Sequence, residues 1–315
     1  MHYLVTGGCG FIGSHLVDAL LERGHDVVVL DDLSTGRTEN LGPGVELIEG
    51  CITDPATVAR AMRGAEGVFH LAAVASVARA NEAWLETHRV NQSGTVTVMA
   101  AAADAGRLPV VYASSAAVYG ANQNLPLEET TPPAPLTAYG ADKLGSELHG
   151  RVAAEIHGLS TVGLRFFNVY GPRQQPGSPY SGVISIFADR VRRGLPLTLH
   201  GDGGQTRDFV YVDDVVRALD LAMQHCHGRV LPAAEIANVC TGRATSIRTL
   251  ADQVMDAAGR RVPVTTTAPR PGDIRASLGD PAHARSLFGF NAETPLAQGL
   301  AALLASLAAA DAAGA

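Results

Sequence analysis

Short apolar runs alternate with longer segments of helical periodicity through the first half of the chain. The runs that predict strands are Tyr3–Thr6, Val27–Leu30, Val68–His70, Val110–Tyr112 and Thr161–Phe166. The segments that predict helices are Phe11–Arg23, Ala56–Met62, Trp84–Ala105 and Ala138–His157. Strands that alternate with helices in this way form a parallel sheet covered on both faces. Because crossovers between parallel strands are right-handed, the pattern predicts an α/β fold with a doubly wound, Rossmann-type parallel sheet.

The pattern is less regular after Phe167. Gly, Pro and Ser dominate the stretch from Tyr170 to Ser181, which predicts a loop, as does the segment Pro269–Asp273. Between and after these loops the sequence predicts helices over Ile184–Arg193, Val215–Met223 and Ser246–Ala257, strands over Val210–Val212 and Ile236–Val239, and a turn at Asp202–Gly204. Ser246 is a candidate N-cap. We therefore expect a smaller C-terminal lobe, interleaved with the sheet domain.

The domain boundaries follow from this change of pattern. The sheet domain is expected to comprise residues 1–166 plus about 210–242, and the smaller lobe residues 167–209 plus 243–305. The alanine-rich end of the chain predicts one helix from about Ala297 onward, and residues 306–315 are expected to be its frayed tail.

Composition and charge exclude several classes of protein. Of the 315 residues, 46% are hydrophobic and 17% charged, as in globular proteins. The formal net charge of −7 disfavours binding to nucleic acids or to anionic membranes. The four cysteines lack metal-ligand spacing, which favours a reduced, cytoplasmic protein without a metal site. We expect no signal peptide or membrane span, because the first strand starts at once and no apolar run is long enough.

A glycine-rich turn, Gly7–Gly13, follows the first predicted strand and opens the first predicted helix. Its Gly8-x-Gly10-x-x-Gly13 pattern suits a dinucleotide pyrophosphate, which needs close backbone approach and the free N–H groups of a helix N-terminus. The alternative is a glycine turn that serves only tight packing. Asp31 and Asp32 end the next strand, where an acidic residue binds the ribose hydroxyls and favours NAD over NADP. Arg37 lies nearby and weakens that preference.

Tyr139 and Lys143 are four residues apart on a predicted helix and so share one face. A phenol titrates near pH ~10, and a useful general base requires a shift of ~3 pKa units, or ~4 kcal/mol. An adjacent ammonium and a cationic nicotinamide together supply such a shift. Ser114 and Ser115 follow a strand, at the carboxyl edge where ligands bind in this fold. Taken singly, the alternatives are a surface pair for Tyr139 and Lys143 and turn residues for the serines.

These motifs resemble the extended short-chain dehydrogenase/reductases, and within them the nucleotide-sugar 4-epimerases. The resemblance covers nearly the whole chain. Its matching segments are Thr6–Gly13, Asp31–Gly36, His70–Ala73, Val90–Thr95, Ser114–Gly120, Arg165–Gln174, Gly201–Phe209 and Arg270–Asp273.

The resemblance implies roles for particular residues. Ser115, Tyr139 and Lys143 would form a catalytic triad. The implied NAD-binding residues are Gly7, Gly10, Phe11, Ile12, Gly13, Asp31, Asp32, Leu33, Ser34, Thr35, Gly36, Cys51, Ile52, Leu71, Ala72, Ala73, Asn91, Ser114, Tyr139, Lys143 and Phe166. The implied substrate-binding residues are Ser76, Ser115, Tyr139, Asn168, Val183, Arg207, Arg270, Asp273 and Ser277. Asn168, Arg207 and Arg270 would hold the diphosphate and uridine end of a UDP-sugar, with Asp273 near the ribose; a guanidinium suits a diphosphate.

The chain departs from the family pattern at Cys51, where relatives usually carry an aspartate that meets the adenine amino group. A thiol is a poor acceptor, so this contact would pass to a backbone carbonyl or a water.

The reaction implied is C4 epimerisation through a transient 4-keto sugar. In related dehydratases an Asp and a Glu follow the triad Ser/Thr, and related decarboxylases need the Glu, whereas this chain has Ala116 and Ala117. In the related epimerases a residue shortly after the Arg-Pro-Gly-Asp motif limits the size of the group at C2, and the small Ser277 at this place implies activity on UDP-GlcNAc/UDP-GalNAc, with UDP-Glc/UDP-Gal as well. Three alternatives stay open: UDP-glucuronate as the substrate, whose carboxylate Arg79 could face; a dehydratase or 4-ketoreductase; and an NAD-binding sensor without activity.

Family members usually form homodimers through helices that correspond to Trp84–Ala105 and Ala138–His157.

Overall fold

A parallel sheet forms the centre of the larger part of the molecule. The structure, a computed structural model, describes residues 1–175, 182–270 and 273–314. In these residues the sheet has seven strands: β1 (His2–Thr6), β2 (Asp26–Asp31), β3 (Glu46–Glu49), β4 (Gly67–His70), β5 (Val110–Ser115), β6 (Thr161–Phe166) and β10 (Ala234–Val239). Their order is β10-β6-β5-β4-β1-β2-β3, and every neighbouring pair is parallel. The predicted Rossmann-type fold is confirmed.

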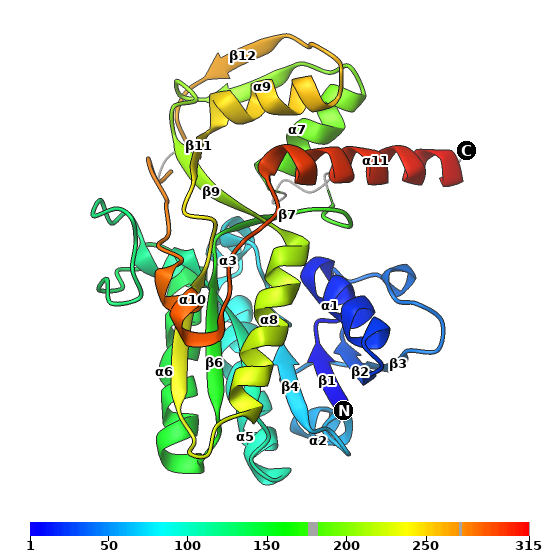
Figure 1. The fold of residues 1–315 in the computed structure, drawn as a ribbon, viewed down its shortest axis with the longest axis vertical. Coiled ribbons are helices and arrows are strands. Elements are labelled where there is room, and N and C mark those ends of the chain that lie inside the picture. Colours follow the sequence, from blue (N-terminus) through cyan, green and yellow to red (C-terminus); the bar gives the residue numbers. More distant parts are fainter. Residues whose placement is uncertain (176–181, 271–272, 315) are drawn as a thin grey trace.

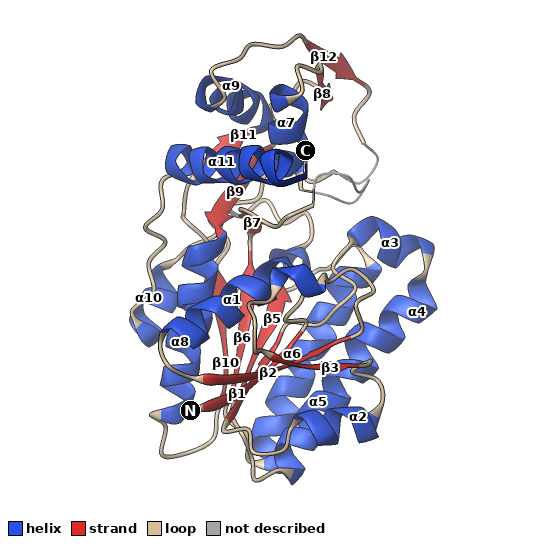
Figure 2. Ribbon diagram, turned by 90° about the vertical axis from the view of Figure 1, so that its right-hand side faces the viewer, coloured by secondary structure: helices blue, strands red, loops and turns tan. Residues whose placement is uncertain are grey.

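Helices cover both faces of this sheet (Figures 1 and 2). On one face lie α1 (Phe11–Glu22), α8 (Val212–His227) and α10 (Ala282–Phe288). On the other lie α2 (Pro55–Ala61), α5 (Gly94–Asp104) and α6 (Ala138–His157). This arrangement explains why the strands are almost continuously apolar, because each strand buries side chains on both faces.

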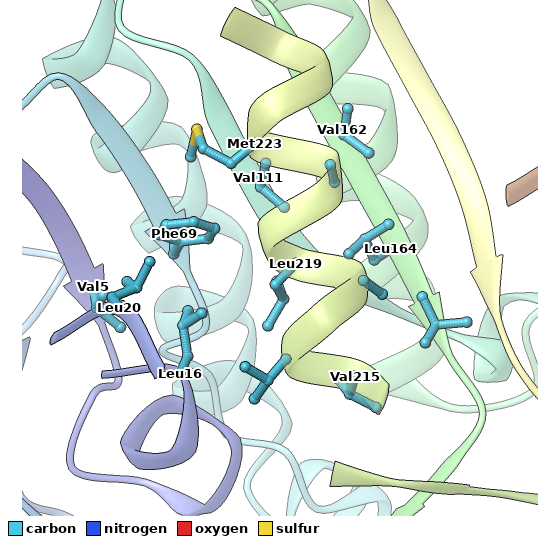
Figure 3. Close-up of a cluster of buried hydrophobic side chains, with 14 of the residues drawn as sticks. Val5, Leu16, Leu20, Phe69, Val111, Val162, Leu164, Val215, Leu219 and Met223 are labelled. Carbon is cyan, nitrogen blue, oxygen red and sulfur yellow. The ribbon is translucent and has the colours of Figure 1, made fainter. Parts of the chain in front are cut away.

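The alternation of side chains along each strand builds two separate cores. Val5 and Val29 enter the core beneath α1 and α8, while Leu4 and Val28, one residue earlier, enter the core beneath α2 and α5. Figure 3 shows the first core, in which Leu219 of α8 lies over the sheet beside Phe69 of β4. Successive residues of a strand point to opposite faces, so a one-residue shift in register would exchange the two sets.

A second lobe packs on the carboxyl side of the sheet, at the top of Figure 1. It contains a sheet of β11 (Ala244–Ser246), β9 (Thr206–Tyr211) and β7 (Asn168–Tyr170), in that order, and the pair β12 (Val264–Thr267) and β8 (Leu197–His200). The helices α7 (Val183–Arg192), α9 (Ile247–Ala257) and α11 (Leu296–Gly314) bury a core of their own with these strands. The exact domain boundaries stay a prediction.

Several predicted elements need correction. The helix predicted over Trp84–Ala105 is α4 (Trp84–His88), a π-helical turn η2 (Arg89–Ser93) and α5, and a short helix α3 (Val77–Glu82) precedes it. The strand predicted at Val210–Val212 is the end of β9, and α8 already starts at Val212. The edge strand β3 has charged ends and escaped notice, as did β8 and β12. The 3₁₀ turns η1 (Thr38–Asn40) and η3 (Ala116–Tyr119) complete the described elements.

Other details agree with the expectations or lie outside the described residues. Ser246 caps α9, because its hydroxyl accepts a hydrogen bond from Thr249 N. The loop predicted from Tyr170 begins at the last residue of β7, and its residues 176–181 lie outside the described part, as do residues 271–272 of the second predicted loop. The helix α11 continues through the predicted tail as far as Gly314. Among the described residues, no helix is long and apolar enough to cross a bilayer.

Candidate active site

The strands of the main sheet all end at one edge, and the candidate site residues follow these ends. Chain order reverses between β1 and β4, which are neighbours in the sheet although β2 and β3 intervene in sequence. In doubly wound sheets a ligand binds at this switch point, outside the carboxyl ends of the strands. The glycine turn leaves β1 at this place, and Leu71–Ala73 leaves β4 beside it.

The glycine turn leaves no room for side chains. A Cβ on Gly13 would lie 2.1 Å from the Gly7 carbonyl oxygen, and one on Gly7 would lie 2.7 Å from Ala72 N. Gly7 also has a φ of +74°, which favours glycine. Gly10 caps α1 without any side-chain hydrogen bond, so the first N–H groups of α1 remain available to an anionic group. The turn therefore fits a dinucleotide pyrophosphate.

Asp31 organises the loop that follows β2. One carboxylate oxygen accepts from Cys9 N and the other from Leu33 N, both at 2.9 Å. A Cβ on Gly36 would lie 2.8 Å from Asp31 Oδ1, so the loop folds tightly around the carboxylate. Burial raises the pKa of Asp31, and the two N–H donors oppose that rise. Asp31 thus binds the glycine turn to the loop predicted to hold the ribose.

The remaining candidate NAD-binding residues lie on the elements that flank this edge. The amide of Asn91 in η2 bonds both backbone groups of Val74, with its Oδ1 2.8 Å from Val74 N. Asn91 therefore fixes the loop after β4.

The Cys51 thiol lies 3.1 Å from the Thr53 hydroxyl, and Ile52 is buried against Gly94. Asp32 accepts from Ser34 N at 3.0 Å. Phe11 and Ile12 are the first residues of α1, and Phe166 ends β6.

The predicted catalytic residues are brought together by α6 and β5. Thr137 caps α6 by accepting from Gly140 N at 3.1 Å, which fixes where the helix begins. Tyr139 shares a hydrogen bond with Ser115 at the end of β5. Lys143 Nζ donates to the Ala113 carbonyl at 2.7 Å and lies 5.8 Å from the centre of the Tyr139 ring.

Burial controls the ionisation of both groups on α6. It raises the pKa of Tyr139, and the hydrogen bond with Ser115 opposes this rise. Burial lowers the pKa of Lys143 to about 8, with Asp142 acting in the opposite direction. The Tyr139–Lys143 spacing predicts a phenol pKa below its usual value, but in this structure the pKa of Tyr139 is higher, because desolvation outweighs the other contributions. A lower phenol pKa would therefore depend on the positive charge of the nicotinamide.

Three buried polar residues near the site were not predicted. Glu147 and Arg165 form a bidentate ion pair with N···O distances of 2.8 and 2.7 Å. Ser114 donates its hydroxyl proton to Glu147 at 2.5 Å. His70 lies between the hydroxyls of Thr6 and Thr95, at 2.8 and 3.0 Å, and burial lowers its pKa to about 3. Glu147 lies four residues after Lys143, a spacing that could have drawn attention to it.

Arg207 and Asp273 meet on the second lobe. The Arg207 guanidinium donates to Asp273 at 2.5 Å and to the Ile274 carbonyl at 2.7 Å. Burial lowers the pKa of Arg207, while the Asp273 carboxylate opposes the change. Asp273 and exposed Arg270 line a depression of about 370 Å³ together with Gln205. The structure therefore places Arg270 and Asp273 around one depression, with Arg207 bonded to Asp273 beside it.

The other predicted substrate residues have individual positions. Ser76 caps α3 by accepting from Arg79 N at 3.1 Å. Asn168 is exposed on β7. Val183 is the first residue of α7 and packs partly against the core of the second lobe. Ser277 donates its backbone N–H to Thr206 at 3.1 Å and so lies beside the start of β9.

Known proteins resemble this chain over nearly its full length. The model of the NAD dependent epimerase/dehydratase family matches residues 3–240. A UDP-glucose 4-epimerase of Mycolicibacterium smegmatis is 39% identical over 308 residues, 96% of each chain. A UDP-glucose 4-epimerase of Thermotoga maritima, solved with UDP-glucose, is 36% identical with a TM-score of 0.93, covering 98% of this chain and 99% of its own. A UDP-N-acetylglucosamine 4-epimerase of Methanobrevibacter ruminantium, solved with UDP-N-acetylmuramic acid, is 33% identical with a TM-score of 0.93, covering 98% of each chain.

The Rossmann sheet, its glycine turn and the Tyr–Lys pair beside Ser115 define a nicotinamide-dependent enzyme of the extended short-chain dehydrogenase/reductase class. The chain belongs to the NAD-dependent epimerase/dehydratase family, and within it to the UDP-hexose 4-epimerases, which are isomerases. Its cofactor is NAD, and the glycine turn fits the pyrophosphate of that cofactor because the first N–H groups of α1 have no side-chain cap.

Proposed function

We propose that this enzyme inverts C4 of a UDP-hexose and acts on UDP-GlcNAc/UDP-GalNAc, on UDP-Glc/UDP-Gal, or on both pairs. The observation that carries the proposal is the contact of α6 with the end of β5, which places Tyr139 against Ser115 and Lys143 beneath the phenol ring. These groups lie at the carboxyl edge of the sheet, where one strand, β4, separates β5 from β1, the strand that leads into the glycine turn.

Each residue has a separate task in this reaction. Tyr139 takes the proton of the sugar O4 hydroxyl and later returns it, and Ser115 orients that oxygen through a hydrogen bond. The Lys143 ammonium stabilises the phenolate electrostatically. Bound NAD would accept the C4 hydride and give it back within each cycle, so there would be no net redox change. Inversion requires the 4-keto sugar to present its other face before the hydride returns.

The residues after Ser115 support epimerisation over dehydration. Ala116 and Ala117 open the 3₁₀ turn η3, and Ala117 N donates to the Ser115 hydroxyl at 3.2 Å. A dehydratase needs an acid and a base near C5 and C6, and a methyl side chain supplies neither. Without these groups, the 4-keto sugar would be reduced again at C4 instead of losing water.

The second lobe supplies groups for the nucleotide. Arg207 and Arg270, with Asn168, are proposed to bind the diphosphate and uridine end, and Asp273 the ribose. The guanidinium of Arg207 is already oriented by two backbone carbonyls, at 2.8 and 2.7 Å, which lowers the entropic cost of binding a planar anion. Holding the nucleotide while the sugar turns is the essential requirement of a 4-epimerase.

The choice of sugar is proposed from the small side chains near the expected hexose site. Ser277 leaves room for an N-acetyl group at C2, and Ser76 and Val183 are assigned to the same pocket. Similarity to both a UDP-glucose and a UDP-N-acetylglucosamine 4-epimerase supports both substrate pairs. UDP-glucuronate has less support, because Arg79 on α3 lies 3.8 Å from Glu86, which already offers it a carboxylate.

The test is to incubate the purified enzyme with UDP-GalNAc, UDP-Gal and UDP-GlcA in separate reactions and to identify the products by NMR. Inversion at C4 of the first or second substrate without net NADH formation is the expected result. A 4-keto-6-deoxy product, a stoichiometric change in NADH, or inversion of UDP-GlcA alone would contradict the proposal.

We also propose that two copies of the chain associate through α6. Leu148, Val152 and Ile156 follow one another at intervals of four residues, and their exposed fractions are 59%, 46% and 73%. Such a row of apolar side chains is typical of a helix that packs against a partner. Location in the cytoplasm stays a prediction.

A further inference from the structure

One side of α6 carries three residues spaced by four: Tyr139, Lys143 and Glu147. Their partners are three consecutive residues at the end of β5: Ser115 for Tyr139, the Ala113 carbonyl for Lys143 and the Ser114 hydroxyl for Glu147. Each of the last three residues of β5 is therefore bonded to α6. The first two bonds belong to the proposed reaction, whereas the third, at 2.5 Å, has no role in it so far.

Glu147 is held more firmly than a surface carboxylate. It is 7% exposed, and its partner Arg165 is 4% exposed. Arg165 Nε and Nη2 donate to the two oxygens at 2.8 and 2.7 Å, so the carboxylate plane is fixed. Arg165 is also the register partner of Ser114 across β5 and β6. Glu147 therefore accepts from two directly adjacent residues of neighbouring strands.

We propose that Glu147 is a positioning residue for the epimerisation: through Ser114 it holds the end of β5 against α6 and thereby sets where Ser115 stands relative to Tyr139. The proposal rests on the proposed function for its catalytic meaning. Its physical basis is that a shift of ~1 Å between reacting groups costs about 100-fold in rate. Ser115 follows Ser114 directly, so a movement of Ser114 is passed on to it through one peptide unit.

A purely structural role for Glu147 makes a different prediction. A buried ion pair with Arg165 would stabilise the fold whether or not Ser114 donates to it. The Ser114 hydroxyl is therefore the informative group, because removing it leaves the ion pair intact and breaks only the bond to β5.

The experiment compares Ser114→Ala with Ser146→Ala. Ser146 is a buried hydroxyl on the same helix that donates to the Asp142 carbonyl at 3.0 Å, so its removal leaves the bonds between α6 and β5 intact. We expect kcat of Ser114→Ala to fall about 10-fold and Ser146→Ala to match the wild type, and NAD content is measured in both because Ser114 is also an implied NAD-binding residue. Ser114→Thr retains a hydroxyl and should recover most of kcat.

A second measurement reads the position of Tyr139 without turnover. The phenol is titrated by ultraviolet difference spectroscopy in each NAD-loaded protein, with Tyr139→Phe as the blank. Because the bond with Ser115 opposes the burial effect on the pKa of Tyr139, loosening it should raise that pKa in Ser114→Ala. Both variants keep the charged groups near Tyr139, which are Lys143 and, beside it, Asp142. His70 on β4 is neutral, because burial lowers its pKa to about 3.

The outcomes separate the two proposals. A higher Tyr139 pKa and lower kcat in Ser114→Ala, but not in Ser146→Ala, support the positioning role. Equal values in Ser114→Ala and wild type, or equal losses in both variants, overturn it. A wild-type enzyme that fails to epimerise any of the sugars refutes the proposed function, while the titration still decides whether Glu147 and Ser114 set the position of Tyr139.

Discussion

Burial acts in opposite directions on the two ionisable residues of the site. It disfavours the charged form of each, so it raises the pKa of the Tyr139 phenol and lowers that of the Lys143 ammonium to about 8. The phenol therefore keeps its proton in the protein alone, whereas the ammonium is close to losing its own. Both shifts are typical of groups that exchange protons in a reaction.

Replacing Tyr139 with Phe removes the proposed base and little else. We expect kcat to fall by about 10²–10⁴-fold, the usual contribution of a positioned acid–base group, while NAD remains bound. The measurement is epimerisation by NMR together with NAD content by absorbance. Activity within threefold of the wild type would show that another group takes the proton.

Replacing Lys143 with Met tests the cost of burying its charge. A folded pKa of about 8 against an unfolded value of 10.5 means that the unfolded chain binds more protons between these pH values, so wild-type stability rises with pH there. Below pH ~8 the buried charge costs about 3 kcal/mol.

We therefore expect the free energy of unfolding of the wild type to rise relative to Lys143→Met between pH 8 and pH 10, as measured by urea denaturation at several pH values. Parallel pH profiles of the two proteins would show that Lys143 titrates normally.

At the scale of elements, short turns and caps determine where helices begin and what their ends can bind. The glycine turn exposes the N-terminus of α1, and Thr137 fixes the start of α6 so that Tyr139 falls in its first turn. Asn91 occupies the π-helical turn η2 and bonds the loop after β4. At the same edge of the sheet, α1 thus presents an N-terminus without a side-chain cap, and α6 presents the reactive side chain of Tyr139.

Gly13→Ala should weaken NAD binding about 10- to 100-fold, because a Cβ there would lie 2.1 Å from the Gly7 carbonyl and must displace the turn. The matched control is Gly42→Ala, where a Cβ meets no atom within 4 Å. NAD affinity of both proteins can be measured by calorimetry after removal of bound cofactor. Equal affinities would mean that the turn does not hold the pyrophosphate.

At the scale of the whole molecule, two lobes face each other across the carboxyl edge of the sheet (Figure 2). The larger lobe carries the glycine turn, Tyr139 and Lys143, and the smaller one carries Arg207 and Asp273. A nucleotide sugar bound between them would meet the reactive groups at one end and the guanidinium at the other. The exposed row Leu148, Val152 and Ile156 lies in the second half of α6, beyond the residues that bond β5.

Ile156→Glu should convert a dimer into a monomer, because the charge would be buried against the same row of the partner helix. Light scattering after size exclusion measures the mass, with Leu195→Glu as a control at a 40% exposed position in the second lobe. A monomeric wild type, or a dimeric Ile156→Glu protein, would contradict association through α6.

The sequence by itself determined the fold class, the glycine turn and the Tyr–Lys spacing, which depend on local periodicity and turn chemistry read over a few consecutive residues. The family followed from the resemblance of motifs along nearly the whole chain. The sequence pattern missed β3 and placed the start of α8 three residues late, because short elements with charged ends carry a weak hydrophobic pattern.

Only the tertiary structure decided which strands are neighbours, and with that the partners of the buried polar groups. Ser114 and Glu147 are 33 positions apart, and Glu147 meets Arg165 only because β5 and β6 pair and α6 lies across them. The direction of the Tyr139 pKa shift depends on the same packing, because burial is a property of the folded molecule and not of any local segment.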